Sequence, residues 1–347
     1  MESVSGDEES VIAISPTNGV IIERERSVSK SQSEVKEMDF DLLLICPVPL
    51  GRSDLSVDFG SAYDRQAHPD PELEQAINKI WEQRVAAQPS LFNGSKFRYG
   101  GFREVRDSEL KIPIKVSLCL GLTDYRTFTG TNLSSKWQEF LVPSGDDLER
   151  CRHTGDPLGN AAVVETTDGK IVVLQRSADV GEFPGTLVFP GGHPEPEEAG
   201  IKSHKESEST NKEELEKKIT EEMFEGIIRE VVEETGIPAS SMTDPVFMGC
   251  SRRKQNVRPA VFFYLRTALT STQVLSNYQH AEHSYESTAL YTLSPEELVE
   301  VAKRMPGCHQ GGAALYQLLR VSAPQFKPME GHSTLSRGAS LQNRFEA

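Results

Sequence analysis

Three glutamates crowd one short stretch in the second half of the chain. The segment 229–237, "REVVEETGI", carries Glu230, Glu233 and Glu234 directly after Arg229. In a helix, spacings of three and four residues bring carboxylates together, and each like-charged pair costs about 0.2–0.5 kcal/mol. A divalent cation would remove this repulsion, and hard ions such as Mg²⁺ prefer oxygen ligands. We therefore expect a metal site here, while the plainer interpretation is a solvated acidic face of a helix.

The bound ion also suggests a substrate class. Mg²⁺ usually keeps several waters and takes its remaining ligands from substrate phosphates, so we expect a phosphate ester as the substrate. No GxxxxGK[ST] phosphate loop and no GxSxG nucleophile motif occurs in the sequence. The chemistry that remains is metal-assisted hydrolysis without a covalent intermediate.

The helix that carries the glutamates is predicted by its apolar periodicity. Gly236 suits the left-handed residue that ends a helix, and Pro238 prevents continuation. Gly226 inside the helix costs about 1 kcal/mol relative to alanine, which indicates a close approach of backbone or ligand. The apolar stripe lies within 219–234, and its members recur at helical spacing: Phe224, Ile227, Ile228 and Val231.

Composition restricts the partners and the compartment. The chain has 347 residues, 37% of them hydrophobic, which allows two domains with apolar cores. Its formal net charge of -15 argues against nucleic acid or an anionic membrane as a partner, because phosphates recruit basic patches. The five cysteines form no CxxC pair, so neither a disulfide framework nor a zinc site is indicated.

The N-terminal sequence and the hydropathy predict an untargeted protein. No apolar run approaches the ~18 residues of a membrane-spanning helix. The first residues, "MESVSGDEES", are acidic where a targeting segment would be basic. We expect a cytoplasmic protein, and the sequence indicates no protein partner.

Composition and turn signals divide the chain into four parts. Residues 1–38 are rich in Ser and Glu and predict a disordered tail, and residues 324–347 form a C-terminal tail. Between them we expect an N-terminal α/β domain at 39–150 and a second α/β domain at 151–323. The predicted elements are helices at 71–88, 219–234 and 294–305, strands at 40–50, 111–122, 185–190, 246–251 and 259–269, a loop at 121–132 and a hairpin turn at Asp168 and Gly169.

The glutamate segment resembles the end of a known family motif. "REVVEETGI" matches, position for position, the end of the Nudix hydrolase box, G-x5-E-x7-R-E-U-x-E-E-x-G-U, in which U is a bulky aliphatic residue. The residue at the glycine position of a contiguous box is Leu215, whereas "PGGHPEPEE" offers Gly192. We interpret this as a box split by a charged insertion at about 197–220. Three residues remain candidates for the first glutamate of the box: Glu198, Glu221 and Glu222.

Four further stretches resemble the UDP-glucose (UDP-sugar) pyrophosphatase branch of this family. They are "LFNGSKFRYGGFR", "GLTDYRTFTGTN", "PGGHPEP" and "AEHSYEST", and the resemblance covers about residues 41–322. It implies the Nudix α/β/α sandwich with a mixed sheet, plus a smaller N-terminal α/β domain. It also implies an enzyme that hydrolyses UDP-glucose or UDP-galactose to UMP and hexose 1-phosphate with Mg²⁺, with Mn²⁺ as an alternative ion. The competing hypotheses are a Nudix pyrophosphatase for ADP-ribose, a dinucleotide or coenzyme A, and a non-catalytic nucleotide sensor.

The resemblance also implies roles for individual residues. Glu230 and Glu234 would bind metal, Glu233 would be a third ligand or would orient water, and Arg229 would orient the carboxylates. Glu286 is a candidate for an additional carboxylate, equally well interpreted as a solvated loop residue. The implied substrate-binding residues are Phe92, Tyr125, Arg176, His193 and Glu195, with main-chain contacts from near Gly181 and Val188. Without the resemblance, Phe92 is more readily interpreted as a core residue and His193 as a loop histidine.

Overall fold

The computed structural model of the chain describes residues 12–14, 21–23, 38–178, 182–207, 211–279, 281 and 287–322. Two short strands, β1 (Ile12–Ile14) and β2 (Ile21–Glu23), pair antiparallel within the segment expected to be a tail. Among the described helices, none combines the length and the apolar character that crossing a membrane requires.

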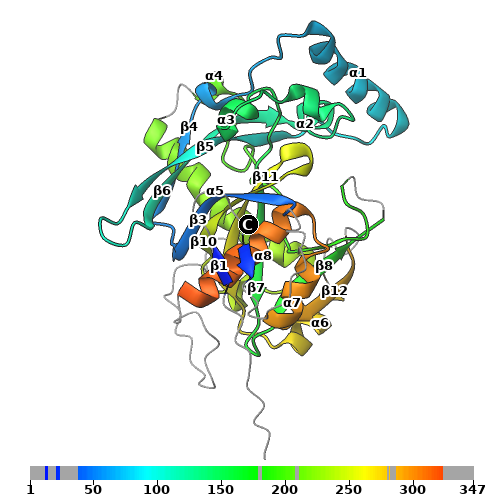
Figure 1. Ribbon diagram of the computed structural model, residues 1–347. Coiled ribbons are helices and arrows are strands. Elements are labelled where there is room, and N and C mark those ends of the chain that lie inside the picture. Colours follow the sequence, from blue (N-terminus) through cyan, green and yellow to red (C-terminus); the bar gives the residue numbers. More distant parts are fainter. Residues whose placement is uncertain are drawn as a thin grey trace, which may run out of the picture.

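Seven strands form one mixed sheet, here called the large sheet (Figure 1). They are β3 (Phe40–Leu50), β7 (Gly159–Glu165), β8 (Ile171–Arg176), β9 (Leu187–Val188), β10 (Val246–Arg253), β11 (Pro259–Arg266) and β12 (Ser287–Leu293). The strand order is β12-β8-β7-β11-β10-β3, and β9 pairs with β8. Strand β11 runs parallel to β7, whereas its pairing with β10 is antiparallel.

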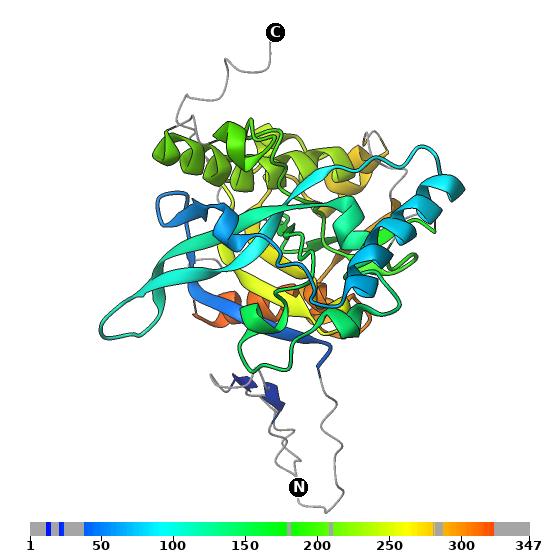
Figure 2. The same ribbon diagram turned by 90° about the horizontal axis from the view of Figure 1, so that it is seen from above.

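Helices cover both faces of the large sheet. One face packs against α5 (Lys212–Thr235) and α6 (Ser271–Tyr278), and the other against α7 (Pro295–Ala302) and α8 (Gly307–Ser322). Figure 2 shows the green helix α5 and the orange-red helix α8 on opposite sides of the sheet. Strand β7 supplies both cores, because Ala162 and Val164 pack on the α5 side and Ala161 and Val163 on the α8 side. The predicted α/β/α sandwich with a mixed sheet is therefore confirmed.

A second, three-stranded sheet, the small sheet, lies at the top of Figure 1. Its strands β4 (Leu55–Phe59) and β5 (Ser95–Arg106) flank β6 (Pro113–Asp124), parallel and antiparallel to it respectively. The helices of this part are α1 (Pro71–Ala87), α2 (Tyr125–Gly130) and α3 (Asp147–Arg150), with the 3-10 turns η1 (Ser61–Tyr63) and η2 (Trp137–Phe140). The remaining short elements are α4 (His204–Ser207), η3 (Ala239–Ser241) and η4 (Gln255–Val257).

Strand β3 belongs to the large sheet, although the sequence assigned it to an N-terminal domain at 39–150. It pairs antiparallel with β10, from Phe40 opposite Arg253 to Leu50 opposite Phe247. A continuous apolar run lacks the alternation that would fix one buried face, so it fits a sheet packed between layers. We therefore propose that β3 and residues 151–322 form one domain, and that residues 51–150 form the smaller one.

Two predicted boundaries change for local reasons. The predicted loop at 121–132 contains helix α2, which Asp124 caps by accepting a hydrogen bond from Thr127 N–H at 2.7 Å. Helix α5 begins at Lys212, within the expected insertion, because Leu215 and Ile219 extend its buried face. Its predicted end is confirmed.

That end is a glycine in the left-handed region. Gly236 has φ 70°, and its N–H donates to the carbonyl of Val232. The chain can therefore leave the helix directly after the glutamate cluster.

A buried ion pair joins the two parts of the chain. Arg252 of β10 is fully buried, and its guanidinium donates to Asp156 Oδ2 and to Asp147 Oδ2, each at 2.9 Å. The same guanidinium lies over the ring of Tyr99 in the small sheet, 5.6 Å from its centroid. Removing one partner of such a pair leaves an uncompensated buried charge, which typically destabilises a protein by about 3–5 kcal/mol.

We expect Asp156→Asn to lower the free energy of unfolding by about 3 kcal/mol, because an amide of the same shape cannot compensate the Arg252 charge. Urea denaturation at neutral pH measures the change. Glu300→Gln is the matched control, since Glu300 pairs with Lys303 at the surface and its loss should cost less than about 1 kcal/mol. Equal effects of the two substitutions would contradict the prediction.

Candidate active site

A glycine loop, residues 190–196, packs directly on the glutamates of α5. Gly191 N–H donates to Glu234 Oε2 at 2.8 Å. A Cβ atom added to Gly192 would lie 2.0 Å from Glu230 Oε1, so a side chain at this position would force the Glu230 carboxylate to move. The fold therefore brings together the two halves of the motif that the insertion separates in the sequence.

The three glutamates lie in a partly enclosed position. Glu234 is 9% exposed, and Glu230 and Glu233 are half-buried on the same side of α5. Within the described residues, no group of three or more His, Cys, Asp or Glu side chains could enclose a metal ion. The pair Glu230 and Glu234, one helical turn apart, fits Mg²⁺ bound through one or two carboxylates together with water and substrate phosphates.

Glu222 occupies the position beside Arg229. Its Oε1 accepts from Arg229 Nη2 at 2.8 Å and from Glu195 N–H at 3.1 Å, and burial raises the pKa of this carboxyl. A Cβ atom at Gly226 would meet the same oxygen at 2.8 Å, which explains the glycine inside the helix. The Arg229 side chain is therefore held by Glu222, which is not one of the three clustered glutamates.

The other two candidates for the first box glutamate lie elsewhere. Glu221, which has the spacing that the family pattern demands, is exposed and lines a groove between α5 and β4. Glu198 is exposed, and its charge affects the pKa of both Arg229 and Glu222. We propose Glu222 for the role, because it makes the contact with Arg229. Its neighbour Glu221 points elsewhere, since one residue along a helix turns the side chain by about 100° around the axis.

Asn160 holds the glycine loop by a side-chain hydrogen bond. It is the second residue of β7, is 3% exposed, and its Oδ1 accepts from Gly192 N–H at 3.2 Å. Its Nδ2 is buried and has no acceptor among the described residues. Such an unpaired buried donor is uncommon in folded proteins and occurs at sites that take a ligand or water.

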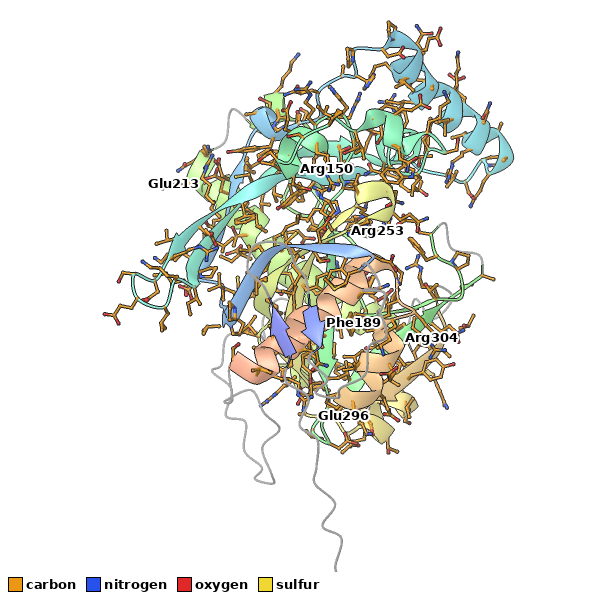
Figure 3. The ribbon with its side chains drawn as sticks, viewed as in Figure 1. Arg150, Phe189, Glu213, Arg253, Glu296 and Arg304 are labelled. Carbon is orange, nitrogen blue, oxygen red and sulfur yellow. The ribbon has the colours of Figure 1, made fainter. Side chains whose placement is uncertain are left out.

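A cation cluster, comprising Arg176, Arg253 and Arg258, lies on the other side of the glycine loop. Both carboxylate oxygens of Glu182 are occupied, one by Arg253 and the other by Arg258 at 2.8 Å. Arg176 Nε donates to the backbone carbonyl of Glu182 at 2.8 Å. The labelled side chain of Arg253 lies between the small and the large sheet in Figure 3.

His193 connects the glycine loop to this cluster. Its Nε2 lies 2.7 Å from Arg258 Nη2. Burial, reinforced by the charge of Arg258, lowers the pKa of His193 well below its usual value. The imidazole is therefore neutral at physiological pH.

The small domain reaches the loop through one ion pair. Lys96 Nζ of β5 donates to Glu195 Oε1 at 2.9 Å, and Glu195 is about half exposed. Phe92 is 74% exposed, so it is not a core residue. Tyr125 starts α2, and its N–H donates to the carbonyl of Gly94 at 3.0 Å, which holds the Phe92 loop near α2.

Three of the proposed substrate-binding or catalytic residues stay predictions. The contact expected near Val188 is a main-chain contact, and its side chain is buried in the core opposite Leu174. Gly181 and Glu286 lie outside the described residues.

Sequence reasoning missed Asn160, Glu182 and Arg258. One signal was present: the segment "RRKQNVR", 252–258, concentrates four cations in a chain of net charge -15. Asn160 and Glu182 carried no local signal, because their roles depend on contacts with distant segments.

Comparisons with known proteins give the following matches. A sequence profile of the NUDIX domain matches residues 157–306. Nudix hydrolase 9 of Arabidopsis thaliana is 56% identical over 283 residues, 81% of this chain and 91% of that protein. Uridine diphosphate glucose pyrophosphatase NUDT22 is 34% identical in Mus musculus over 73% of this chain and 80% of that protein, and 32% identical in Homo sapiens over 81% and 92% respectively.

His309, which binds the chain just before the glycine loop, predicts a pH dependence of stability. Phe189 N–H donates to His309 Nδ1 at 3.2 Å, and burial lowers the pKa of His309 to about 3. An unfolded histidine titrates near 6.5, so below about pH 6.5 the unfolded chain takes up a proton that the folded chain refuses. Stability from this group is complete above about pH 6.5 and falls as the pH drops toward 3.

We expect His309→Gln to flatten the decline of unfolding free energy between about pH 6 and pH 4 by about 1 kcal/mol per pH unit. Urea denaturation of both proteins at several pH values in this interval measures it. Parallel profiles for the two proteins would refute the assignment.

Proposed function

The chain belongs to the Nudix hydrolase family, and from this premise we propose that it hydrolyses UDP-glucose or UDP-galactose to UMP and hexose 1-phosphate. Two relatives that match most of this chain carry the name uridine diphosphate glucose pyrophosphatase. Both alignments cover more of this chain than the NUDIX match at 157–306, since they extend over 73% and 81% of it, which supports a shared substrate class.

The single observation that carries a hydrolase function here is the contact of the glycine loop with the glutamate helix. A loop glycine approaches Glu230 so closely that a methyl group would collide, and the neighbouring N–H binds Glu234. A solvated acidic face would not need backbone packed against its carboxylates. The same observation argues against a sensor that has lost its metal-binding residues.

Glu230 and Glu234 would hold Mg²⁺, or Mn²⁺ in its place. When bound, the ion neutralises charge on the phosphates and lowers the pKa of water. Glu233 lies one turn from Glu230, where a carboxylate can orient the attacking water and take its proton. Arg229, fixed by Glu222, would keep the helix face in register with the loop.

The substrate anion would meet the opposite side of the loop. The cation cluster contains three guanidiniums and contacts one carboxylate, Glu182, among the described residues, which leaves positive charge for a diphosphate. Arg176 and His193 are the residues that we assign to the phosphates, and Glu195 to the adjoining sugar side. Phe92 and Tyr125 are exposed or half-buried aromatic rings, suited to stack on uracil.

A substrate panel tests the proposed specificity. The purified chain with Mg²⁺ should release UMP from UDP-glucose or UDP-galactose faster than it cleaves ADP-ribose, a dinucleotide or coenzyme A. Faster cleavage of one of the latter compounds would retain the Nudix chemistry and overturn the UDP-sugar assignment. No cleavage of any compound, with retained nucleotide binding, would favour the sensor.

We expect Glu230→Gln to lower kcat for UMP release by about 100-fold or more, because a neutral amide cannot balance the charge of a bound cation. Glu225→Gln is the matched control on the same helix, since Glu225 faces away and pairs with Arg52 at the surface. Comparable losses in both variants would indicate a general effect on the helix.

We expect Gly192→Ala to lower kcat by about 10-fold or more, because the added methyl group must displace the carboxylate group of Glu230. Gly200→Ala is a control for substitution in the same region, since a Cβ atom there meets nothing within 4 Å although its φ of 76° adds local strain. Steady-state kinetics and thermal melting together separate displacement of the carboxylate from unfolding. Unchanged kcat in Gly192→Ala would refute a tight loop contact.

A further inference from the structure

The imidazole of His193 is held by a guanidinium. Arg258 Nη2 lies 2.7 Å from His193 Nε2. An arginine side chain has five N–H donors and no acceptor, so Nε2 must be the nitrogen without a proton. The proton of the neutral ring therefore resides on Nδ1, for which no described residue provides an acceptor.

Arg258 cannot easily turn away from His193. Glu182 Oε2 accepts from its Nη1 at 2.8 Å, on the side opposite the imidazole contact. The guanidinium also lies over the ring of Phe128 in α2, 5.7 Å from the ring centroid. Gly159 leaves room for the guanidinium, because a Cβ atom there would meet Nη2 at 3.0 Å. The contacts with Glu182 and Phe128 come from two different segments and restrict the orientation of the guanidinium.

Burial and nearby cations keep His193 neutral. Its pKa is lowered first by burial and then by the charges of four cations: Arg258, Lys96, Arg253 and Arg176. A neutral imidazole with a defined tautomer has a donor on one nitrogen and an acceptor on the other. Because Nε2 accepts from Arg258, only the Nδ1–H donor of His193 is left to bind a ligand.

The place of His193 in the glycine loop indicates which ligand its Nδ1–H group can bind. His193 directly follows Gly192, which contacts Glu230, and it precedes Glu195 in the same loop. The loop that carries this N–H group thus contacts Glu230 through Gly192 and the cation cluster through the His193 ring. Its chemical complement is an anionic oxygen, as found in a diphosphate.

We propose that Arg258 is a positioning residue that holds His193 as the Nδ1–H tautomer, so that the imidazole donates a hydrogen bond to a diphosphate oxygen of the substrate. The substrate part of this inference rests on the proposed function, whereas the tautomer does not. Arg258 itself need not touch the substrate.

Nitrogen NMR of the full chain with labelled histidine tests the tautomer without substrate. His193→Ala identifies the His193 signals. The wild-type ring should show a protonated Nδ1 and an unprotonated Nε2, and Arg258→Met should allow the Nε2–H tautomer to appear. Arg253→Met is the control, since it removes a neighbouring cation from Glu182 without touching His193, and it should leave the Nδ1–H signature in place. A wild-type ring protonated at Nε2, or an unchanged signature in Arg258→Met, would overturn the proposal.

Kinetics test whether Arg258 acts through His193. We expect Arg258→Met and His193→Ala each to lower kcat/KM by about 10- to 100-fold, mainly through KM, and the double variant to lose no more than the larger single loss. Arg258→Lys retains a donor and should recover part of the activity. Additive losses, or equal losses in the lysine and methionine variants, would indicate a structural role and contradict the proposal.

The two hypotheses fail in different ways. If wild type releases no UMP from UDP-sugars while the tautomer result holds, the proposed substrate is wrong and the positioning by Arg258 stands. If UMP forms but the Nδ1–H signature is missing, this inference is wrong and the proposed function stands.

Discussion

The whole arrangement depends on the close contact between backbone glycine and helical carboxylate. A side chain at position 192 would displace the Glu230 carboxylate, and Gly191 donates its N–H to Glu234. This contact fixes the carboxylates against a rigid loop and shields them partly from water, which strengthens their interaction with a cation. Because the loop follows strand β9 and the glutamates lie on α5, the large sheet must position both before the site exists.

A second constraint is the charge distribution of an acidic chain that binds an anion. The net charge of -15 would repel a nucleotide diphosphate at long range, so binding requires local concentration of cations. The segment 252–258 supplies it between two strands of the large sheet. One of its arginines, Arg252, is neutralised by Asp156 and Asp147 and serves stability, whereas Arg253 and Arg258 share one carboxylate. The arginine that serves stability is thus a sequence neighbour of the arginines in the cation cluster proposed for the diphosphate, but it has two carboxylate partners where they share one.

Sequence patterns correctly predicted features that depend on a single segment of the chain. The periodicity of α5, its glycine end and the α/β/α sandwich could be predicted because they follow from local spacing and from the motif. The sequence could not decide which residue is the first box glutamate. Glu221 has the spacing of the family pattern, whereas Glu222, which we propose for the role, makes the contact with Arg229. The loop expected at 121–132 is partly helical because one aspartate cap outweighs weak periodicity.

The sequence by itself determined the helix, the cluster of carboxylates on it, and the family whose box is split by an insertion. Only the tertiary structure decided that Gly192 meets Glu230, that β3 joins the large sheet, and that Arg258 reaches His193 across 65 positions of chain. The physical reason is that spacing along one helix fixes its own faces, whereas contacts between distant segments depend on how the sheet and the helices pack.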